Sequence, residues 1–170
     1  LLAVLNACAR VTKTVSKIEW HTPEAVGTWI SKIQGQRKDS NNVLALECLS
    51  LLNLSKCILH NRDFHNANLE GANLSNTLLA YTHFVGANLK GVNIQAAWLV
   101  VANLEGANLV GANLEDANLE GANLEGANLE GANLVGANLK GANLEWPRLK
   151  RTNFESENVA YLNEGSDSND

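Results

Sequence analysis

Four side chains in the first half of the chain are of the types that bind metal ions. His60, Asp63, His65 and His83 supply imidazole and carboxylate groups, which are common ligands of zinc and related ions. The competing interpretation is that they are surface polar residues, joined at most by a hydrogen bond between Asp63 and a histidine. We adopt this second interpretation, and we expect neither a metal ion nor a cofactor.

A second group of candidates is acidic. Six carboxylates lie between Lys90 and Lys140 with no Lys or Arg among them: Glu105, Glu115, Asp116, Glu120, Glu125 and Glu130. Like charges at short separation repel one another, so this accumulation could serve to bind a cationic partner. It could also serve solubility, because exposed faces often carry glutamate, and solubility is the simpler explanation.

The overall composition limits the class of protein. The chain has 170 residues and a net charge of −5, which argues against direct binding to nucleic acids or to anionic membranes. It contains no run of 18 or more apolar residues, so no membrane-spanning helix is expected. Its three cysteines show no metal-ligand spacing, which favours a reducing compartment and a cytoplasmic location.

The element that must position the candidate residues is a repeat with a period of five. From Ala67 onward the chain contains units such as ANLEG, ANLKG and THFVG, and a Leu, Phe or Ile recurs at every fifth position from 54 to 154. A helix cannot use this period, because successive leucines would rotate by roughly 140° and form no stripe. A flat strand fails because its two faces would exchange at each unit. Both conflicts disappear if the chain bends at each Glu-Gly pair.

These units resemble the pentapeptide repeat family, whose pattern is A-[DN]-[LF]-x-x, and the resemblance covers residues 52–156. It implies an all-β solenoid, namely a right-handed quadrilateral parallel β-helix of about five coils stacked ~4.8 Å apart. It also implies a bacterial protein that acts as a protein-interaction or scaffold module.

A coil of four units places residues that differ by twenty positions in one vertical column. Leu104 and Leu124 are therefore expected to lie above one another in a filled core that leaves no tunnel for a ligand. One outward column should form an amide ladder of Asn73, Asn93, Asn113 and Asn133. Because a filled rod has no cleft in which polar groups converge, we predict no catalytic residue and no enzyme activity.

Some positions depart from the repeat. Arg62 and Thr77 occupy small inward positions, and an unpaired buried charge is costly, so we expect an irregular first coil over 52–71. Trp98 replaces an Asn. Pro147 and Glu157 predict that regularity is lost near the end.

The chain divides into three segments. Residues 1–50 show helical periodicity, with Val26, Trp29, Ile30 and Ile33 on one face of a helix over 22–34, and we expect a helical N-terminal cap or linker. Residues 51–156 form the repeat, and residues 157–170 are an acidic tail that we expect to be disordered. Leu1–Ala9 is apolar but lacks a basic start, which favours an ordinary helix over a trimmed signal.

The function that we predict is non-enzymatic binding of a protein partner. The candidate contact residues are Glu105, Glu115, Glu120, Glu125, Glu145 and Trp98. One alternative is a DNA-mimicking regulator of a topoisomerase, because some members of the family resemble duplex DNA in shape and charge and inhibit DNA gyrase. Another alternative is an interaction tail of a larger multidomain protein.

The C-terminal end of the repeat offers a further contact. Trp146, Phe154, Tyr161 and Leu162 could cover the last coil within one chain, or they could join two rods end to end in a homodimer. Capping within one chain is the simpler alternative, since an open solenoid end exposes core side chains.

Overall fold

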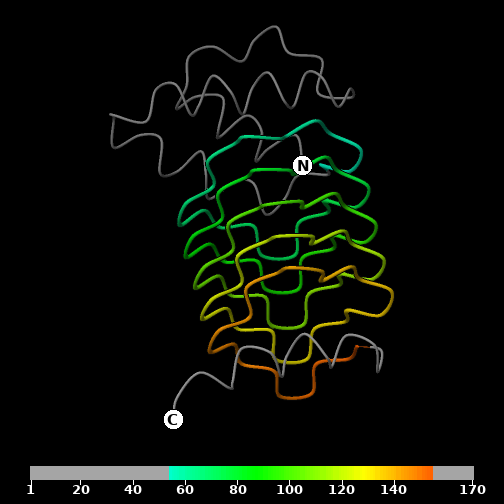
Figure 1. Cartoon of the computed structure of the whole chain (residues 1–170). Coiled ribbons are helices and arrows are strands. Elements are labelled where there is room, and N and C mark those ends of the chain that lie inside the picture. The colour runs from blue at the N-terminus through cyan, green and yellow to red at the C-terminus, as the bar shows by residue number, and fades with distance from the viewer. Residues whose placement is uncertain (1–53, 155–170) are drawn as a thin grey trace, which may run out of the picture.

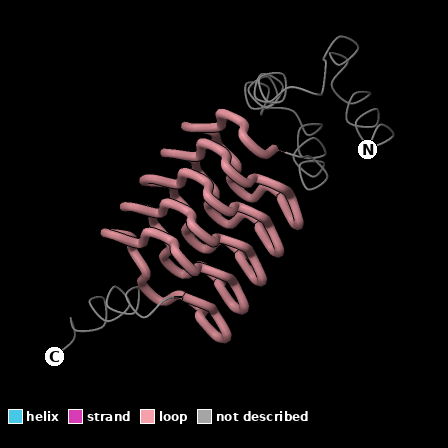
Figure 2. Tube along the Cα trace, turned by 90° about the vertical axis from the view of Figure 1, so that its right-hand side faces the viewer, coloured by secondary structure: helices cyan, strands magenta, loops and turns pink. Residues whose placement is uncertain are grey.

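The computed structural model describes residues 54–154, which wind into a stack of square coils (Figures 1 and 2). Between Leu54 and Phe154 there is no helix and no strand longer than one bridge residue. Instead, one residue in every unit of five pairs in parallel with the residue twenty positions later, from Ile58 with Leu78 to Asn133 with Asn153. The predicted period of five and the predicted coil of four units are both present.

Backbone hydrogen bonds hold each coil to the next. The amide of Leu104 donates to the carbonyl of Asn123 in the following coil at 2.7 Å, and the amide of Asn103 donates to the carbonyl of Thr82 in the preceding coil at 2.9 Å. This pair of bonds recurs along the stack. It satisfies the backbone groups that a chain with so many bends would otherwise leave unpaired.

Each corner is a tight turn whose third residue has a positive φ. At one corner the amide of Ala107 donates to the carbonyl of Leu104 at 3.0 Å, and Gly106 between them has a φ of 61°. A type II turn requires this conformation at its third residue, and glycine adopts it at the least cost. Ten of the corner positions between 56 and 151 are glycine, and ten are other residues, including Val101 and Trp146.

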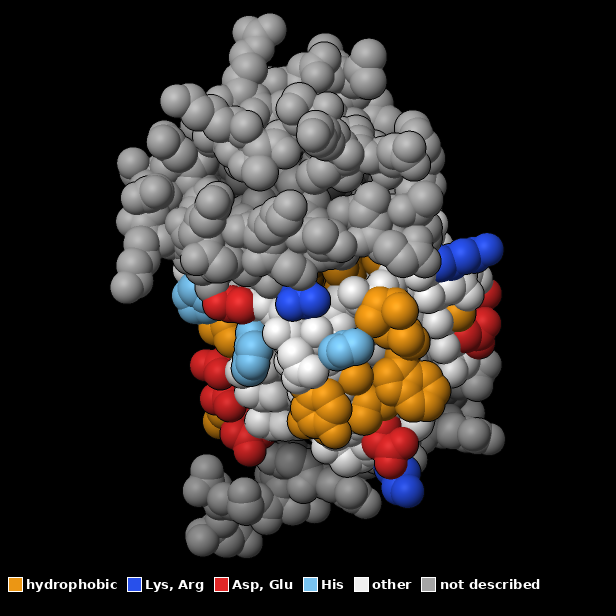
Figure 3. All heavy atoms as spheres, turned by 90° about the horizontal axis from the view of Figure 1, so that it is seen from above, with side chains coloured by type: hydrophobic (Ala, Val, Ile, Leu, Met, Phe, Trp, Pro, Cys, Tyr) orange, Lys and Arg blue, Asp and Glu red, His pale blue; other side chains and the backbone are white. Residues whose placement is uncertain are grey.

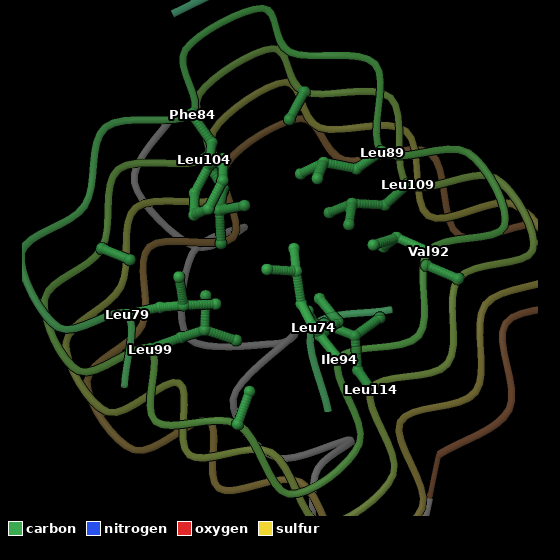
Figure 4. Close-up of a cluster of buried hydrophobic side chains, with 14 of the residues drawn as sticks. Leu74, Leu79, Phe84, Leu89, Val92, Ile94, Leu99, Leu104, Leu109 and Leu114 are labelled. Carbon is green, nitrogen blue, oxygen red and sulfur yellow. The ribbon is translucent and has the colours of Figure 1, made fainter. Parts of the chain in front are cut away.

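The central residue of each unit points toward the axis of the stack. Leu104 and Leu124 are fully buried, as their predicted column requires. Figure 4 shows Leu74, Ile94 and Leu114 gathered at one side of the core, one from each successive coil. Buried alanines occupy most of the small inward positions, so the interior of the described coils is filled with side chains.

Two buried threonines replace alanine without leaving a polar group unpaired. The Thr77 hydroxyl donates to the carbonyl of Leu54 at 2.8 Å, and the Thr82 hydroxyl donates to the carbonyl of Leu59 at 3.1 Å. Each bond reaches the preceding coil, so the hydroxyl adds a link along the axis. Thr77 is therefore compatible with a regular coil.

The prediction of an irregular first coil is wrong. Asp63 pairs with His83 in the same register as all later coils. Phe64 is fully buried and stacks on Phe84, with ring centroids 5.3 Å apart. Arg62 is only partly buried, although its Nε is enclosed without a hydrogen-bond partner, and its carbonyl accepts the amide of His83 at 2.8 Å. The backbone thus closes the coil whatever side chain stands at position 62.

The predicted loss of regularity at Pro147 is also wrong as far as Phe154. Arg148 pairs with Asn128 immediately after the proline, so the register continues. What changes in this last coil is burial, because its inward residues are only partly covered. These residues are Ala142, Leu144, Leu149 and Phe154.

Several predictions fall outside the described residues. They are the helical cap over 1–50, the tail over 157–170, Glu157, Tyr161 and Leu162. Among residues 54–154 no helix is long and apolar enough to cross a membrane.

Candidate protein-interaction surface

The outer faces of the stack carry ladders of asparagine. Asn133 Nδ2 donates to Asn113 Oδ1 at 3.3 Å, and Asn153 Nδ2 donates to Asn133 Oδ1 at 3.2 Å. The same Asn133 oxygen accepts the amide of Val135 at 3.3 Å, which ties the side chain to its own corner. Asn113 Nδ2 also donates to Asn93 Oδ1 at 3.5 Å, so the predicted amide ladder is present from Asn93 to Asn133. Each of these side chains links two coils, and its oxygen also binds a backbone amide of its own coil.

In two of the corner columns a lysine stands one coil after a glutamate. Lys90 Nζ lies 3.2 Å from Glu70, and the pairs Lys140–Glu120 and Lys150–Glu130 are each separated by 4.0 Å. The hydrogen bond from Lys90, together with one from Asn88, holds the pKa of the Glu70 carboxyl below its ordinary value. All three pairs are exposed, so each contributes little to stability but neutralises its glutamate.

One acidic column has no such compensation. Glu105, Glu125 and Glu145 follow one another at the same corner in successive coils, roughly 4.8 Å apart. Within residues 54–154 no lysine or arginine forms an ion pair with any of them. A side-chain hydrogen bond fixes the backbone at this corner, because the Glu125 amide donates to Asn123 Oδ1 at 3.1 Å. The column is a row of exposed or half-exposed carboxylates on a backbone that is hydrogen-bonded from coil to coil.

The other two predicted carboxylates lie elsewhere. Glu120 belongs to a different corner, where it pairs with Lys140. Glu115 belongs to a third corner, where it accepts a hydrogen bond from Asn133 Nδ2 at 3.3 Å. The structure therefore brings together three of the five glutamates that the sequence suggested.

Backbone contacts bring Asp63, His65 and His83 close together. Asp63 and His83 are neighbours through a parallel bridge, and Asp63 Oδ1 accepts the amide of His65 at 2.9 Å. Among residues 54–154 no three His, Cys, Asp or Glu side chains are arranged so that they could hold a metal ion.

Sequence reasoning missed an apolar surface around Trp98. Figure 3 shows hydrophobic side chains gathered on one face of the stack. The large side chains exposed on this part of the rod are Ile58, Leu78, Tyr81, Trp98 and Val101, which we call the apolar patch. The available signal was that Ile58, Leu78 and Trp98 occupy the asparagine position of one column in three successive coils. Only Trp98 was singled out.

The two described residues of the predicted end contact differ in exposure. Trp146 is 82% exposed, whereas Phe154 is partly buried against the core. End-to-end pairing of two rods remains a prediction.

The comparisons with known proteins agree with this architecture. The family model described as Pentapeptide repeats matches the chain in eight copies, over residues 48–77, 57–95, 67–106, 99–136 and 116–155. The chain belongs to the pentapeptide repeat family, and its fold is the right-handed quadrilateral β-helix of that family.

Several solved structures are similar to this chain. The pentapeptide repeat protein Rfr23 from the cyanobacterium Cyanothece 51142 is 35% identical, with 66% of this chain and 93% of that chain covered and a TM-score of 0.39. The pentapeptide repeat protein alr5209 from Nostoc PCC 7120 is 33% identical, with 55% of this chain and 85% of that chain covered and a TM-score of 0.38. QnrB1, a plasmid-mediated fluoroquinolone resistance protein, is 19% identical, with 66% of this chain and 62% of that chain covered and a TM-score of 0.48. No curated protein matches this chain.

Proposed function

We propose that this chain is a non-enzymatic interaction module, a rod of about five coils that presents a flat outer surface to a protein partner. The filled core supports the proposal, because the inward positions of the described coils are occupied by Leu, Phe and Ala. Catalysis needs polar groups that converge in a cleft. Most of the charged side chains of residues 54–154 instead stand at the outer corners of the coils.

The uncompensated column of Glu105, Glu125 and Glu145 carries this proposal. Three carboxylates stacked roughly 4.8 Å apart repel one another. Elsewhere in the same rod, lysine one coil away neutralises the glutamate, as in the pair of Lys90 with Glu70. The repeat therefore has a simple way to remove the repulsion and does not use it on this column. A partner with a row of basic side chains would supply the missing positive charge.

The test is capture of the partner with a variant in which Glu105, Glu125 and Glu145 are all changed to Gln. The immobilised wild-type chain is exposed to lysate of the source organism, and the retained proteins are identified by mass spectrometry. We expect a specific basic protein to be retained by the wild type and lost with the triple variant.

A matched control changes Glu115, Glu120 and Glu130 to Gln, which alters the net charge by the same amount at other corners. This control should retain the partner, because its acidic column is intact. Equal capture by both variants and the wild type would exclude the column as the binding surface. Equal loss with both variants would mean that net charge alone is responsible.

A further inference from the structure

The apolar patch interrupts an otherwise polar column. In three successive coils this column holds Ile58, Leu78 and Trp98, whose side chains are 54%, 44% and 50% exposed. The next two coils return to asparagine, where Asn138 Nδ2 donates to Asn118 Oδ1 at 3.1 Å. The backbone register is the same throughout the column. The apolar side chains are therefore not needed to form the coil, and they face outward for another reason.

The patch contains a hollow that matches one large side chain. Its volume is about 280 Å³, and it is lined by His60, Asn61, Leu78, Ala80, Tyr81 and Trp98. Pockets for small-molecule ligands usually measure roughly 300–1,000 Å³ and enclose most of the ligand. An open hollow of this size on an apolar face is better suited to an anchoring side chain of a polypeptide.

The extent of the patch argues against a second rod as its occupant. Five half-exposed large side chains offer roughly 400 Å² of apolar surface, given that aromatic residues bury about 150–250 Å² each. A stable protein–protein interface needs about 800 Å² from each partner. The patch is about half of that, which is enough for a single segment that is already tethered nearby.

The position of the patch identifies the tethered segment. The patch is confined to residues 58–101, the coils nearest to Leu54, and 53 residues of this chain precede Leu54. Those residues include the predicted helix over 22–34, whose apolar face carries Val26, Trp29 and Ile33. Two turns of a helix rise ~11 Å, which matches the ~10 Å height of three stacked coils.

We propose that the segment 22–34 packs its apolar face over Ile58, Leu78 and Trp98 and inserts the Trp29 side chain into the hollow. An aromatic ring placed there would meet two other aromatic rings, an arrangement that is favourable beyond simple burial. The segment is the occupant of the patch and covers a surface that would otherwise be prone to unspecific association.

Hydrogen exchange of the full chain tests the proposal. The variant Leu78→Asn/Trp98→Asn gives the first coils the residue found at 118 and 138, so the rod should still fold. A short helix without packing is only marginally stable, so amides of 22–34 should exchange at least roughly tenfold faster in this variant than in the wild type. The control Val110→Gln/Val135→Gln removes two apolar side chains at corners outside the patch and should leave these rates unchanged.

A substitution on the other side of the proposed contact supplies a second measurement. Trp29→Ala leaves the rod untouched and should increase the oxidation of Tyr81 and Trp98 in hydroxyl-radical footprinting. Both effects should be independent of protein concentration, because the contact lies within one chain. Unchanged exchange in the double variant with unchanged oxidation in Trp29→Ala would overturn the proposal. Protection that disappears on dilution would overturn it in favour of a second copy.

Discussion

At the scale of single residues, the corners determine which substitutions the rod tolerates. Gly131 and Gly136 have the same φ of 69°, but their surroundings differ. At Gly131 no atom beyond the glycine and its two chain neighbours lies within 4 Å of the position that a Cβ would take. At Gly136 a Cβ would overlap Oδ1 of Asp116, which stands one coil earlier in the same column. The two glycines therefore separate the cost of backbone conformation from the cost of crowding.

We expect Gly131→Ala to destabilise the chain by about 1 kcal/mol, the usual cost of placing alanine in the left-handed region. Gly136→Ala should cost more, because Asp116 must also move. Chemical denaturation of both variants measures the difference. Changing Asp116 to Gly in the Gly136→Ala background should remove the excess. Equal stability of the two alanine variants would contradict the predicted crowding.

At the scale of the repeat unit, much of the fold could be predicted because a period of five leaves few alternatives. The bends and the inward leucines follow from the spacing. The asparagine ladders also need a coil of four units, which the resemblance to the family implied. The error at Arg62 arose because the register predicts where a backbone position lies but not how far a long side chain extends from it. The apolar patch was missed for another reason. Ile58, Leu78 and Trp98 stand in one column and Tyr81 and Val101 in the next, so the patch becomes visible only when these two neighbouring columns are compared together.

Burial within one column predicts a graded response to the same substitution. Leu109 is fully buried in the middle of the stack, whereas Leu149 in the last coil is only partly covered. Leu109→Ala should cost about 2–5 kcal/mol, because it removes a buried side chain between two neighbours. Leu149→Ala should cost clearly less, because part of that side chain already contacts solvent. Thermal unfolding followed by circular dichroism compares the two, and equal costs would mean that the end coil is covered as completely as the middle.

At the scale of the whole molecule, the distribution of charge separates a protein-binding rod from a mimic of DNA. Residues 52–156 contain seven basic and ten acidic side chains, a net charge of −3. Duplex DNA carries one negative charge per roughly 1.7 Å of its axis and no positive charge. Lys90, Lys140 and Lys150 each stand one coil after a glutamate of the same column, so two of the corner columns carry both signs of charge. Within the coils of residues 54–154, only the column of Glu105, Glu125 and Glu145 is acidic over successive coils.

We therefore expect micromolar concentrations of this chain to leave the supercoiling activity of purified DNA gyrase unchanged. Mimicry requires a continuous negative potential along the rod, and Lys90, Lys140 and Lys150 interrupt it. A variant in which these three lysines are changed to Glu keeps the coil geometry, because all three are exposed corner residues. This variant tests whether a rod of this shape inhibits gyrase once its negative charge is continuous. Inhibition by the wild-type chain would contradict this expectation and would favour the topoisomerase regulator over the protein-binding module.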